Sequence, residues 1–270
     1  MNKYLIFRTD RIGDFLVSAV LIKSIKDSDA SSHITLIASP KNYNYIKNFK
    51  LVDKVLLLKP NFINKISIIL KLCKESFNTI ILHDNKKRSH FISSFIKKKI
   101  KISINDIKDK THLDILKEVL KKLNLSLSES HLDIFEDREI YKFNYSNFVQ
   151  FHFDEKWIYS KYISSFVNIE PNANELANFI DLIQKKVNKK VIITTGKNAP
   201  SILEESIKLC KNENLIYLKD LSFEKLENVV LNSDLLISCH GAISHVASAK
   251  KIKQIDIIDS SYPYSKWTRH

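Results

Sequence analysis

One short stretch near the end of the chain carries residue types that suit the binding of a phosphate group. An apolar run of strand type, 235–237, ends there in a polar turn, and the sequence predicts a helix of small residues over 242–250. The polar side chains and the glycine of this turn and of the first helical turn are Cys239, His240, Gly241, Ser244 and His245. The unpaired N–H groups at a helix start favour a phosphate, and Gly241 would let a ligand approach the backbone closely. The alternative is a plain strand–helix–strand unit in which His245 packs against its neighbours or caps the helix.

A second candidate for chemistry is Asp14, near the beginning of the chain. It follows the apolar run 4–7 and stands next to Gly13, at the start of a segment with apolar residues at helical spacing. A carboxylate at a helix start can cap the exposed N–H groups, which stabilises the helix by about 1 kcal/mol. It can also serve as a general base that faces a crevice. Position alone leaves both roles open.

A third group is the basic trio Lys86, Lys87 and Arg88, which follows the predicted strand 79–82. In an open parallel sheet, ligands bind where the carboxyl end of a strand meets the next helix. These side chains are therefore candidates for contact with an anionic ligand. The alternative is a solvated start of the helix that the sequence predicts over 91–96.

The elements that must position these residues alternate between strands and helices. Strands are expected at 4–7, 34–38, 55–58, 79–82, 100–104, 148–153, 191–195, 215–218, 235–237 and 255–258. Helices are expected at 62–77, 91–96, 112–123, 157–167, 174–187, 200–210, 223–231 and 242–250, besides the one at Asp14. This alternation indicates α/β domains with parallel sheets covered by helices on both faces. A polar stretch, 124–147, interrupts it, and we expect a short strand at 131–135 within a connection between two domains, 1–145 and 146–270.

The composition limits the classes of function. The chain has 270 residues, is 44% hydrophobic and carries a formal net charge of +13, which favours an anionic partner. Its three cysteines are far apart and make neither a disulfide framework nor a spaced metal site, which favours a reducing compartment. No apolar run approaches the ~18 residues of a spanning helix, and charged residues interrupt the apolar residues at the start. We therefore expect a cytoplasmic protein with at most a peripheral contact at the cytoplasmic face of the inner membrane.

Four stretches, taken together, resemble one known family. They are RTDRIGDFLVSAVLIKSIK (8–26), NTIILHDNKKRSHFISSF (78–95), FVQFHFDEKW (148–157) and NSDLLISCHGAISHVASAKKIKQIDII (232–258). Their order and spacing are similar to those of the motifs of glycosyltransferase family 9, the bacterial lipopolysaccharide heptosyltransferases. The resemblance covers nearly the whole chain. It implies the GT-B arrangement, in which two Rossmann-like domains face a central cleft, with the acceptor site in the first and the donor site in the second.

The resemblance also implies a reaction. A family member transfers a heptose or related sugar, with inversion and without a metal or other cofactor, from a nucleotide diphosphate sugar to a lipid-linked cell-envelope glycan. By this match Asp14 is the general base that removes the proton of the acceptor hydroxyl. The residues that would meet the departing diphosphate are Lys156, Gly241, Ser244 and His245, and those near the donor sugar are Cys239 and His240. The residues that would contact an anionic lipid-linked acceptor are Arg11, Lys86, Lys87 and Arg88.

The chain departs from the family pattern at one point of the last motif. Where the family has Asp and then Ser or Thr before the glycine, this chain has Cys239 and His240. Because the family's aspartate lies near the donor sugar, the resemblance does not fix which sugar is transferred. The pair Asp27 and Asp29 at a predicted helix end reads as surface charge rather than as a metal site.

Three other classes of function can be compared with the same features. A catalytically silent nucleotide-sugar-binding or scaffold protein is the alternative that the departure at Cys239 and His240 supports. A nucleic-acid-binding protein would suit the charge, but the positive residues are spread along the chain and no helix-turn-helix or RNA-binding motif occurs, so no nucleic acid is expected. A dinucleotide oxidoreductase is disfavoured because the chain lacks Gly-x-Gly-x-x-Gly.

Overall fold

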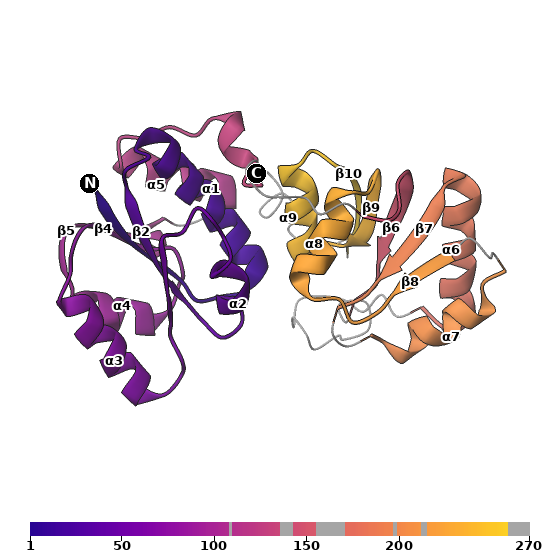
Figure 1. The fold of residues 1–270 in the computed structure, drawn as a ribbon, viewed down its shortest axis with the longest axis horizontal. Helices are drawn as coiled ribbons and strands as arrows, with labels where there is room; N and C mark the ends of the chain where they lie inside the picture. Colours follow the sequence, from indigo (N-terminus) through magenta and orange to yellow (C-terminus); the bar gives the residue numbers. More distant parts are fainter. Residues whose placement is uncertain (108–109, 136–142, 155–170, 197–198, 212–214, 259–270) are drawn as a thin grey trace. The chain divides into compact units, whose positions relative to one another are not determined.

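The computed structural model describes residues 1–107, 110–135, 143–154, 171–196, 199–211 and 215–258. They form two compact units, whose described parts run over 1–135 and 143–258 (Figure 1). Each unit contains one five-stranded parallel sheet with helices packed on it, so the expected α/β class with two Rossmann-like domains is confirmed. The arrangement of the two domains around a central cleft and the boundary near residue 145 stay predictions. The helix expected over 157–167 lies outside the described residues.

The first unit has the strand order β3-β2-β1-β4-β5. Its strands are β1 (Lys3–Arg8), β2 (His33–Ala38), β3 (Lys54–Leu57), β4 (Ser76–Leu82) and β5 (Lys97–Ser103). Its helices are α1 (Ile12–Ser28), α2 (Tyr43–Ile46), α3 (Phe62–Cys73), α4 (Lys87–Ser94) and α5 (His112–Lys122), with 3-10 turns η1 (Ile104–Asp106) and η2 (Glu129–Leu132). Helices α1 and α5 cover one face of the sheet, and α3 and α4 cover the other (Figure 1).

The core of this unit explains why its strands read as continuous apolar runs. The central strand β1 is covered on both faces, which leaves Leu5, Ile6 and Phe7 fully buried. Helix α1 is buried over its whole middle part, from Phe15 to Ile25. Because this helix is buried rather than exposed on the surface, the loop between β1 and α1 is held at both ends by rigid elements.

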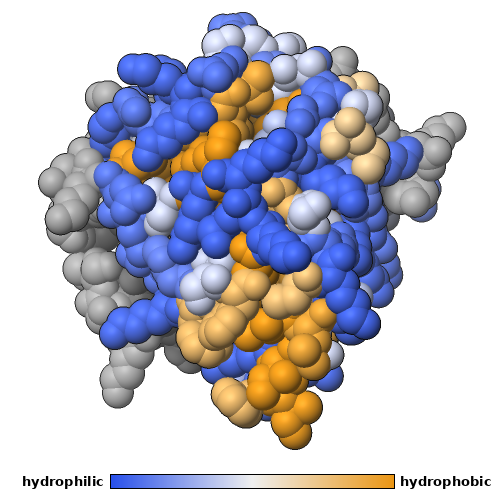
Figure 2. Space-filling view, turned by 90° about the vertical axis from the view of Figure 1, so that its left-hand side faces the viewer, coloured by the Kyte–Doolittle hydropathy of each residue, from blue (hydrophilic) through white to orange (hydrophobic). Residues whose placement is uncertain are grey.

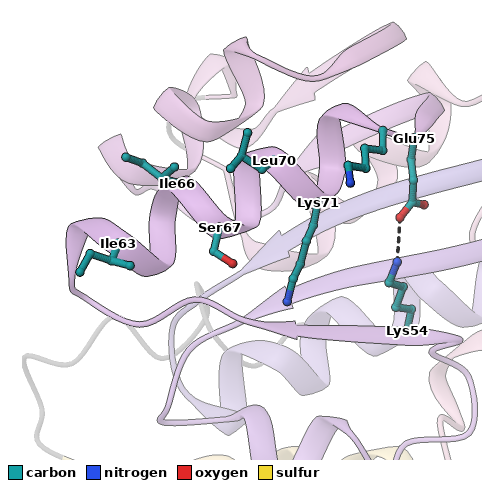
Figure 3. A pocket seen from close by; sticks show the side chains of 8 residues that line it. Lys54, Ile63, Ile66, Ser67, Leu70, Lys71 and Glu75 are labelled. Atoms are coloured by element: carbon teal, nitrogen blue, oxygen red, sulfur yellow. Dashed lines mark hydrogen bonds and ion pairs between the residues drawn. The ribbon is translucent and has the colours of Figure 1, made fainter.

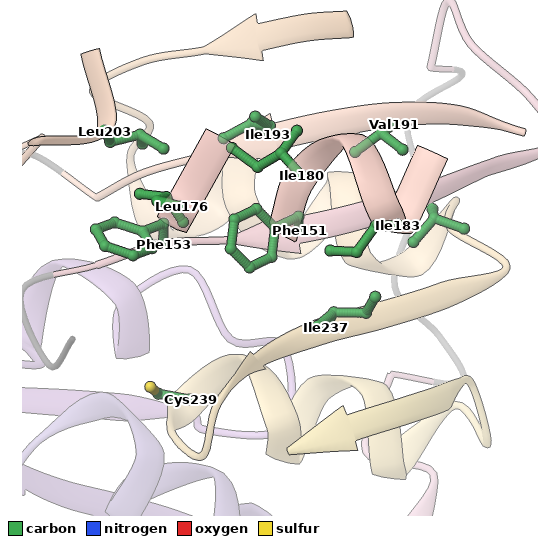
Figure 4. Close-up of a cluster of buried hydrophobic side chains, with 11 residues drawn as sticks. Phe151, Phe153, Leu176, Ile180, Ile183, Val191, Ile193, Leu203, Ile237 and Cys239 are labelled. Atoms are coloured by element: carbon green, nitrogen blue, oxygen red, sulfur yellow. The ribbon is translucent and has the colours of Figure 1, made fainter. Parts of the chain in front are cut away.

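The second unit has the strand order β10-β9-β6-β7-β8. Its strands are β6 (Phe148–His152), β7 (Lys190–Thr194), β8 (Leu215–Leu218), β9 (Leu235–Cys239) and β10 (Lys253–Ile257). Its described helices are α6 (Ala173–Val187), α7 (Ser201–Leu209), α8 (Phe223–Leu231) and α9 (Ala242–Ala249). Between the sheet and α6 lies a cluster of buried side chains that includes Phe151, Ile180 and Ile193, and Cys239 closes its end toward α9 (Figure 4).

The two sheets repeat one topology. When the strands of each unit are counted in chain order, both sheets read 3-2-1-4-5, so the strand order reverses between the first and fourth strands. Ligands of open α/β sheets bind at this reversal, outside the carboxyl ends of the strands. The reversal lies between β1 and β4 in the first unit and between β6 and β9 in the second. These two places are therefore where the fold offers binding sites.

One expectation for the first unit is wrong. The short strand expected at 131–135 is not formed, and the chain there makes the turn η2. The alternation of Leu132 and Ile134 with polar residues imitates a strand, but side chains bond to the local backbone instead. His131 accepts a hydrogen bond from the N–H of Ser128 at 3.2 Å, a type of contact that favours turns over a sheet ladder.

Several boundaries also differ from the sequence prediction: the helix expected over 91–96 begins at Lys87, and the strand expected over 100–104 begins at Lys97. The helix expected over 62–77 ends at Cys73, and the next strand begins at Ser76, three residues earlier than expected.

Within the part of the chain that the structure describes, no helix is both long and apolar enough to cross a membrane.

Candidate functional site

The loop between β1 and α1 brings Asp14 to the carboxyl end of the central strand. Asp14 occupies the first turn of α1, and its carboxylate accepts a hydrogen bond from the backbone N–H of Arg11 at 3.0 Å. This is the capping contact that the sequence allowed. The side chain nevertheless keeps 27% of its surface exposed, and a carboxylate has room for further partners. Asp14 is therefore a helix cap that a ligand can still reach.

Arg8 at the end of β1 anchors this loop from below. Its guanidinium is buried, and its Nε donates to the carbonyl oxygen of Asp14 at 2.8 Å. Its Nη1 donates to the carbonyl oxygen of His83, the first residue after β4. Its two Nη atoms also lie 3.7 Å from carboxylate oxygens of Asp10 and Asp14. One buried cation thus ties the loop after β1 to the loop after β4.

The carboxylate of Asp84 makes the same connection from the other side. It is completely buried and accepts hydrogen bonds from the backbone N–H of Thr9 at 3.1 Å and from the Thr9 hydroxyl. It also accepts from the hydroxyl of Ser89 in α4 at 2.9 Å. Asp84 therefore fixes the start of α4, which carries the basic trio, against the loop that carries Asp14.

His83 lies directly under this arrangement. The side chain is buried, and its Nδ1 shares a hydrogen bond of 2.7 Å with the hydroxyl of Ser18 in α1. Burial, with the positive charge of Arg8 nearby, lowers the pKa of His83 well below its usual value. The ring is therefore neutral at neutral pH and adds no charge to the site.

A pocket of about 830 Å³ opens above these residues. Four loops line it, each following the carboxyl end of one of the strands β1 to β4. The lining residues are Thr9, Asp10, Arg11, Asp14, Ser39, Pro40, Lys41, Pro60, Lys86, Lys87 and Arg88. The pocket thus joins Asp14 with five cations, of which the Lys86 ammonium lies 3.2 Å from an Asp10 carboxylate oxygen. Five positive against two negative side chains make it a site for an anion.

The structure therefore brings five of the predicted site residues into one pocket. They are Asp14, Arg11, Lys86, Lys87 and Arg88. Arg88 is also structural, since its Nη2 donates to the carbonyl oxygen of Thr9 at 3.2 Å. The sequence analysis missed Lys41, Asp10 and Asp84 as parts of this site. Asp84 had a signal, because it is a carboxylate two residues after the apolar run of β4.

The predicted phosphate-binding turn of the second unit lies between β9 and α9, as expected. Gly241 is the residue before α9 in an extended conformation, and its N–H donates to the hydroxyl oxygen of Ser244 at 3.2 Å. The Ser244 hydroxyl donates in turn to Asp256 of β10 at 2.8 Å. The first turn of the helix is thus fastened to the neighbouring strand.

Asp256 is the centre of this second arrangement. Its side chain is 1% exposed, and its other carboxylate oxygen accepts a hydrogen bond of 3.0 Å from Nδ1 of His240. The rings of His240 and His245 meet edge to face with centroids 5.3 Å apart. The buried carboxylate therefore fixes both the turn and the first turn of α9. Its sequence signal was a lone acid within the apolar run of β10.

The end of β6 adds a further polar group to the second unit. Nδ1 of His152 lies 3.0 Å from the Thr194 hydroxyl, and its Nε2 lies 3.6 Å from a carboxylate oxygen of Asp154. His152 stands at the sheet reversal between β6 and β9, where it pairs with Ser238. Lys156, the residue assigned to the diphosphate two positions farther on, lies outside the described residues.

Metal-binding residues do not cluster in the described parts of the chain, where no group of three or more His, Cys, Asp or Glu side chains could hold an ion. Asp27, of the pair that the sequence analysis read as surface charge, lies 3.5 Å from the Lys23 ammonium at the end of α1. Asp29 accepts hydrogen bonds from Asn2 and Ser31.

Solved structures share this architecture over nearly the whole chain. An Escherichia coli heptosyltransferase WaaC with ADP-2-deoxy-2-fluoro heptose superposes with a TM-score of 0.72 at 13% identity, covering 98% of this chain and 91% of that one. A family 9 glycosyltransferase from Veillonella parvula has the same TM-score and identity, covering 100% of this chain and 85% of that one. The chain has the fold of the family 9 glycosyltransferases.

The GT-B fold of these glycosyltransferases also occurs in other enzymes of nucleotide sugars. A putative UDP-N-acetylglucosamine 2-epimerase from Listeria monocytogenes superposes with a TM-score of 0.62 at 10% identity, covering 96% of this chain and 79% of that one. No protein-family model matches the sequence, and no curated protein matches it either. The comparisons therefore show the fold.

Proposed function

We propose that the protein is an inverting glycosyltransferase that moves a heptose or related sugar from a nucleotide diphosphate sugar to an anionic, lipid-linked cell-envelope glycan, lipopolysaccharide being the acceptor that the sequence resemblance implies. The observation that carries the proposal is the pocket of the first unit, where a reachable carboxylate, Asp14, stands among five cations. A general base next to an anion-binding surface is what transfer to an acidic glycan requires. The place of action in this proposal is the cytoplasmic face of the inner membrane.

The chemical step uses Asp14 as the base. The acceptor hydroxyl gives its proton to the Asp14 carboxylate while its oxygen forms a bond to the anomeric carbon of the donor. The bond from that carbon to the diphosphate breaks, and its electron pair leaves with the diphosphate. Attack from the side opposite the leaving group inverts the anomeric centre. Capping by the Arg11 N–H holds the carboxylate in one orientation for this transfer.

The basic side chains of the pocket bind the acceptor in this proposal. Arg11, Lys86, Lys87 and Arg88 would contact its phosphate or acidic sugar groups. Lys86 already lies beside the Asp10 carboxylate, which holds the ammonium at the pocket wall. The hydrogen bonds of Asp84 to Thr9 and Ser89, which we call the clamp, hold these cations and the base in fixed positions.

The donor belongs to the second unit in this proposal. The start of α9, with Gly241, Ser244 and His245, would stabilise the departing diphosphate, together with Lys156. Charge stabilisation of this kind assigns no step to a metal or another cofactor. In this proposal His240 and Cys239 would lie near the donor sugar, and the hydrogen bond to Asp256 orients the His240 ring. Two related heptosyltransferase structures contain ADP or an ADP-heptose analogue, which supports a nucleotide sugar as the donor.

A thermal-shift screen tests the proposal. Nucleoside diphosphates and nucleotide sugars are added one by one, and a ligand at ~100 times its dissociation constant should add ~2.7 kcal/mol to the free energy of unfolding. We expect at least one nucleotide sugar and its diphosphate to raise the melting temperature. If neither class shifts it, the proposal fails.

The second candidate is a catalytically silent nucleotide-sugar-binding protein. Cys239 and His240 favour it, because they replace the family's Asp and Ser or Thr. The two candidates separate on turnover: a silent protein would shift in the thermal screen but release no nucleoside diphosphate from the bound donor, even when acceptor glycolipid is present.

A further inference from the structure

Helix α3 carries apolar side chains on two sides, and only one side is needed for the core. Ile68 and Leu72 face inward and pack with Phe77 and Ile92. On the outer side Ile63 is 82% exposed and Leu70 60% exposed. The outer row therefore contributes little to folding of this unit.

Two phenylalanines of the neighbouring segment extend this apolar surface. Phe91 in α4 and Phe95 directly after it are both half exposed, and their rings pack edge to face with centroids 5.1 Å apart. The Cys73 thiol at the end of α3 donates to the carbonyl oxygen of Phe95 at 3.2 Å, so the two helices meet there. We call this the α3–α4 surface; its apolar side chains are Phe62, Ile63, Ile66, Leu70, Phe91 and Phe95.

The apolar side chains are concentrated on this surface. The described residues include eleven exposed large apolar side chains, and six of them belong to the α3–α4 surface. Figure 2 shows apolar side chains gathered toward the lower end of this side of the molecule and a further group near its upper end, with hydrophilic side chains between them. A contiguous exposed apolar patch rimmed by polar residues marks an interaction site.

The charges around the surface are almost all positive. The segment 62–101 contains ten Lys and Arg residues and only two acidic residues. Of these two, Glu75 is paired with the Lys54 ammonium at 2.7 Å, and Asp84 is buried in the clamp. The segment that forms the surface is therefore strongly positive, and Lys71 and Lys74 lie beside its apolar side chains.

A groove along α3 places the two kinds of group next to each other. It has a volume of about 550 Å³, and Ile63, Ile66 and Leu70 line it together with Lys71 and Lys74 (Figure 3). Aliphatic side chains beside ammonium groups match the boundary between the acyl chains and the head groups of an anionic bilayer.

We propose that the α3–α4 surface is the docking surface of this protein for an anionic lipid bilayer. A second copy of the chain is the weaker occupant, because two such positive surfaces would repel each other. Helix α3 begins at Phe62, two residues after Pro60, which lines the pocket of the first unit. Docking through α3 would therefore hold this pocket near the membrane, where a lipid-linked substrate resides. The inference does not depend on the proposed reaction, because docking requires neither donor nor acceptor.

Vesicle flotation of the full-length protein tests the docking surface. The vesicles contain phosphatidylcholine alone or phosphatidylcholine with phosphatidylglycerol. We expect the wild-type protein to float with the anionic vesicles and to dissociate at high salt. The double variant Ile63→Ser/Leu70→Ser should partition at least about tenfold less, because both side chains lose the apolar area that they would bury. Its melting temperature should stay unchanged, since both residues are exposed.

Matched controls exclude a general effect of surface substitution. Leu182→Ser/Leu209→Ser removes two side chains of the second unit that are 50% and 48% exposed, and it should bind vesicles as the wild type does. Lys71→Gln/Lys74→Gln should lower partitioning by about fivefold for each lysine, the equivalent of ~1 kcal/mol. Lys121→Gln/Lys122→Gln on α5 should change it less than twofold.

Three results would overturn the docking surface. The wild-type protein could show no preference for anionic vesicles, or the Ile63/Leu70 variant could float as well as the wild type. The wild type could also be a dimer in solution that this variant dissociates, which would make a second copy the occupant. Failure of the proposed reaction would be detected in a different experiment, the thermal screen, in which no nucleotide sugar would raise the melting temperature.

Discussion

The carboxylate of Asp84 holds Thr9 through both the backbone N–H and the hydroxyl of that residue, although the two lie 75 positions apart in the sequence. The same carboxylate accepts a hydrogen bond from Ser89 at the start of α4. The contact joins the carboxyl ends of β1 and β4 at the place where the strand order reverses. These hydrogen bonds therefore hold the loop that carries Asp14 and the segment that carries the basic trio in fixed positions at one pocket.

Replacing Asp84 should therefore cost stability. Asp84→Asn keeps the size of the side chain but removes the negative charge of the carboxylate, which accepts three hydrogen bonds. We therefore expect the free energy of unfolding to fall by about 2 kcal/mol. Urea unfolding followed by circular dichroism measures it. Asp106→Asn, an exposed acid of the same unit, is the control and should change stability by less than about 0.5 kcal/mol. Equal stability of the two variants would show that Asp84 is not a clamp.

His83 should make the stability of the protein depend on pH. Its pKa is well below the ordinary value of 6.5 in the folded state and near that value in the unfolded chain. The contribution of His83 to the free energy of unfolding is therefore fully present above pH 6.5. As the pH falls below 6.5, the unfolded state takes up a proton that the folded state does not. Between pH 7 and pH 5.5 this should remove about 1 kcal/mol.

The comparison with His83→Gln isolates that effect. Urea unfolding of both proteins is measured from pH 7.5 to pH 5.5, and only the wild type should lose the additional ~1 kcal/mol on acidification. Parallel loss in both proteins would mean that other groups, rather than His83, take up the proton.

Asp256 should matter for ligand binding as well as for stability. Asp256→Asn removes the charge that accepts from His240 and Ser244, which should lower the free energy of unfolding by about 2 kcal/mol. It should also weaken the binding of a nucleoside diphosphate, because the first turn of α9 loses its anchor. Calorimetric titration measures the affinity. Asp234→Asn, which breaks an exposed pair with Lys189, is the control and should leave both quantities near the wild-type values. If Asp256→Asn bound the nucleoside diphosphate as tightly as the wild type does, the start of α9 would not be part of the binding site.

The alternation of elements could be predicted from the sequence because parallel strands are covered on both faces and read as unbroken apolar runs. Strand β8 and helix α8 have the predicted bounds. The same logic predicted where Asp14 and the basic trio lie, since each follows the end of such a run.

The buried face of α3 could not be predicted in this way. Ile63, Ile66 and Leu70 recur at helical spacing as core residues do, yet all three are exposed, and Ile68 and Leu72 form the buried face. Two apolar faces on one helix leave the pattern ambiguous. The roles of Asp84 and Asp256 were also out of reach, because their partners Thr9 and His240 are distant in sequence and meet them only through the sheet order.

The account rests on Asp14 as the base of a sugar transfer, and Asp14→Asn tests it most directly. The measurement is the rate of nucleoside diphosphate release from the donor found in the thermal screen, with cell-envelope glycolipid as acceptor. Asparagine keeps the size and the capping oxygen, so the variant should fold and bind nucleotide as the wild type does while release slows by ~10²-fold or more. Release at the wild-type rate by a well-folded Asp14→Asn protein would contradict the assignment and leave Asp14 as a helix cap alone.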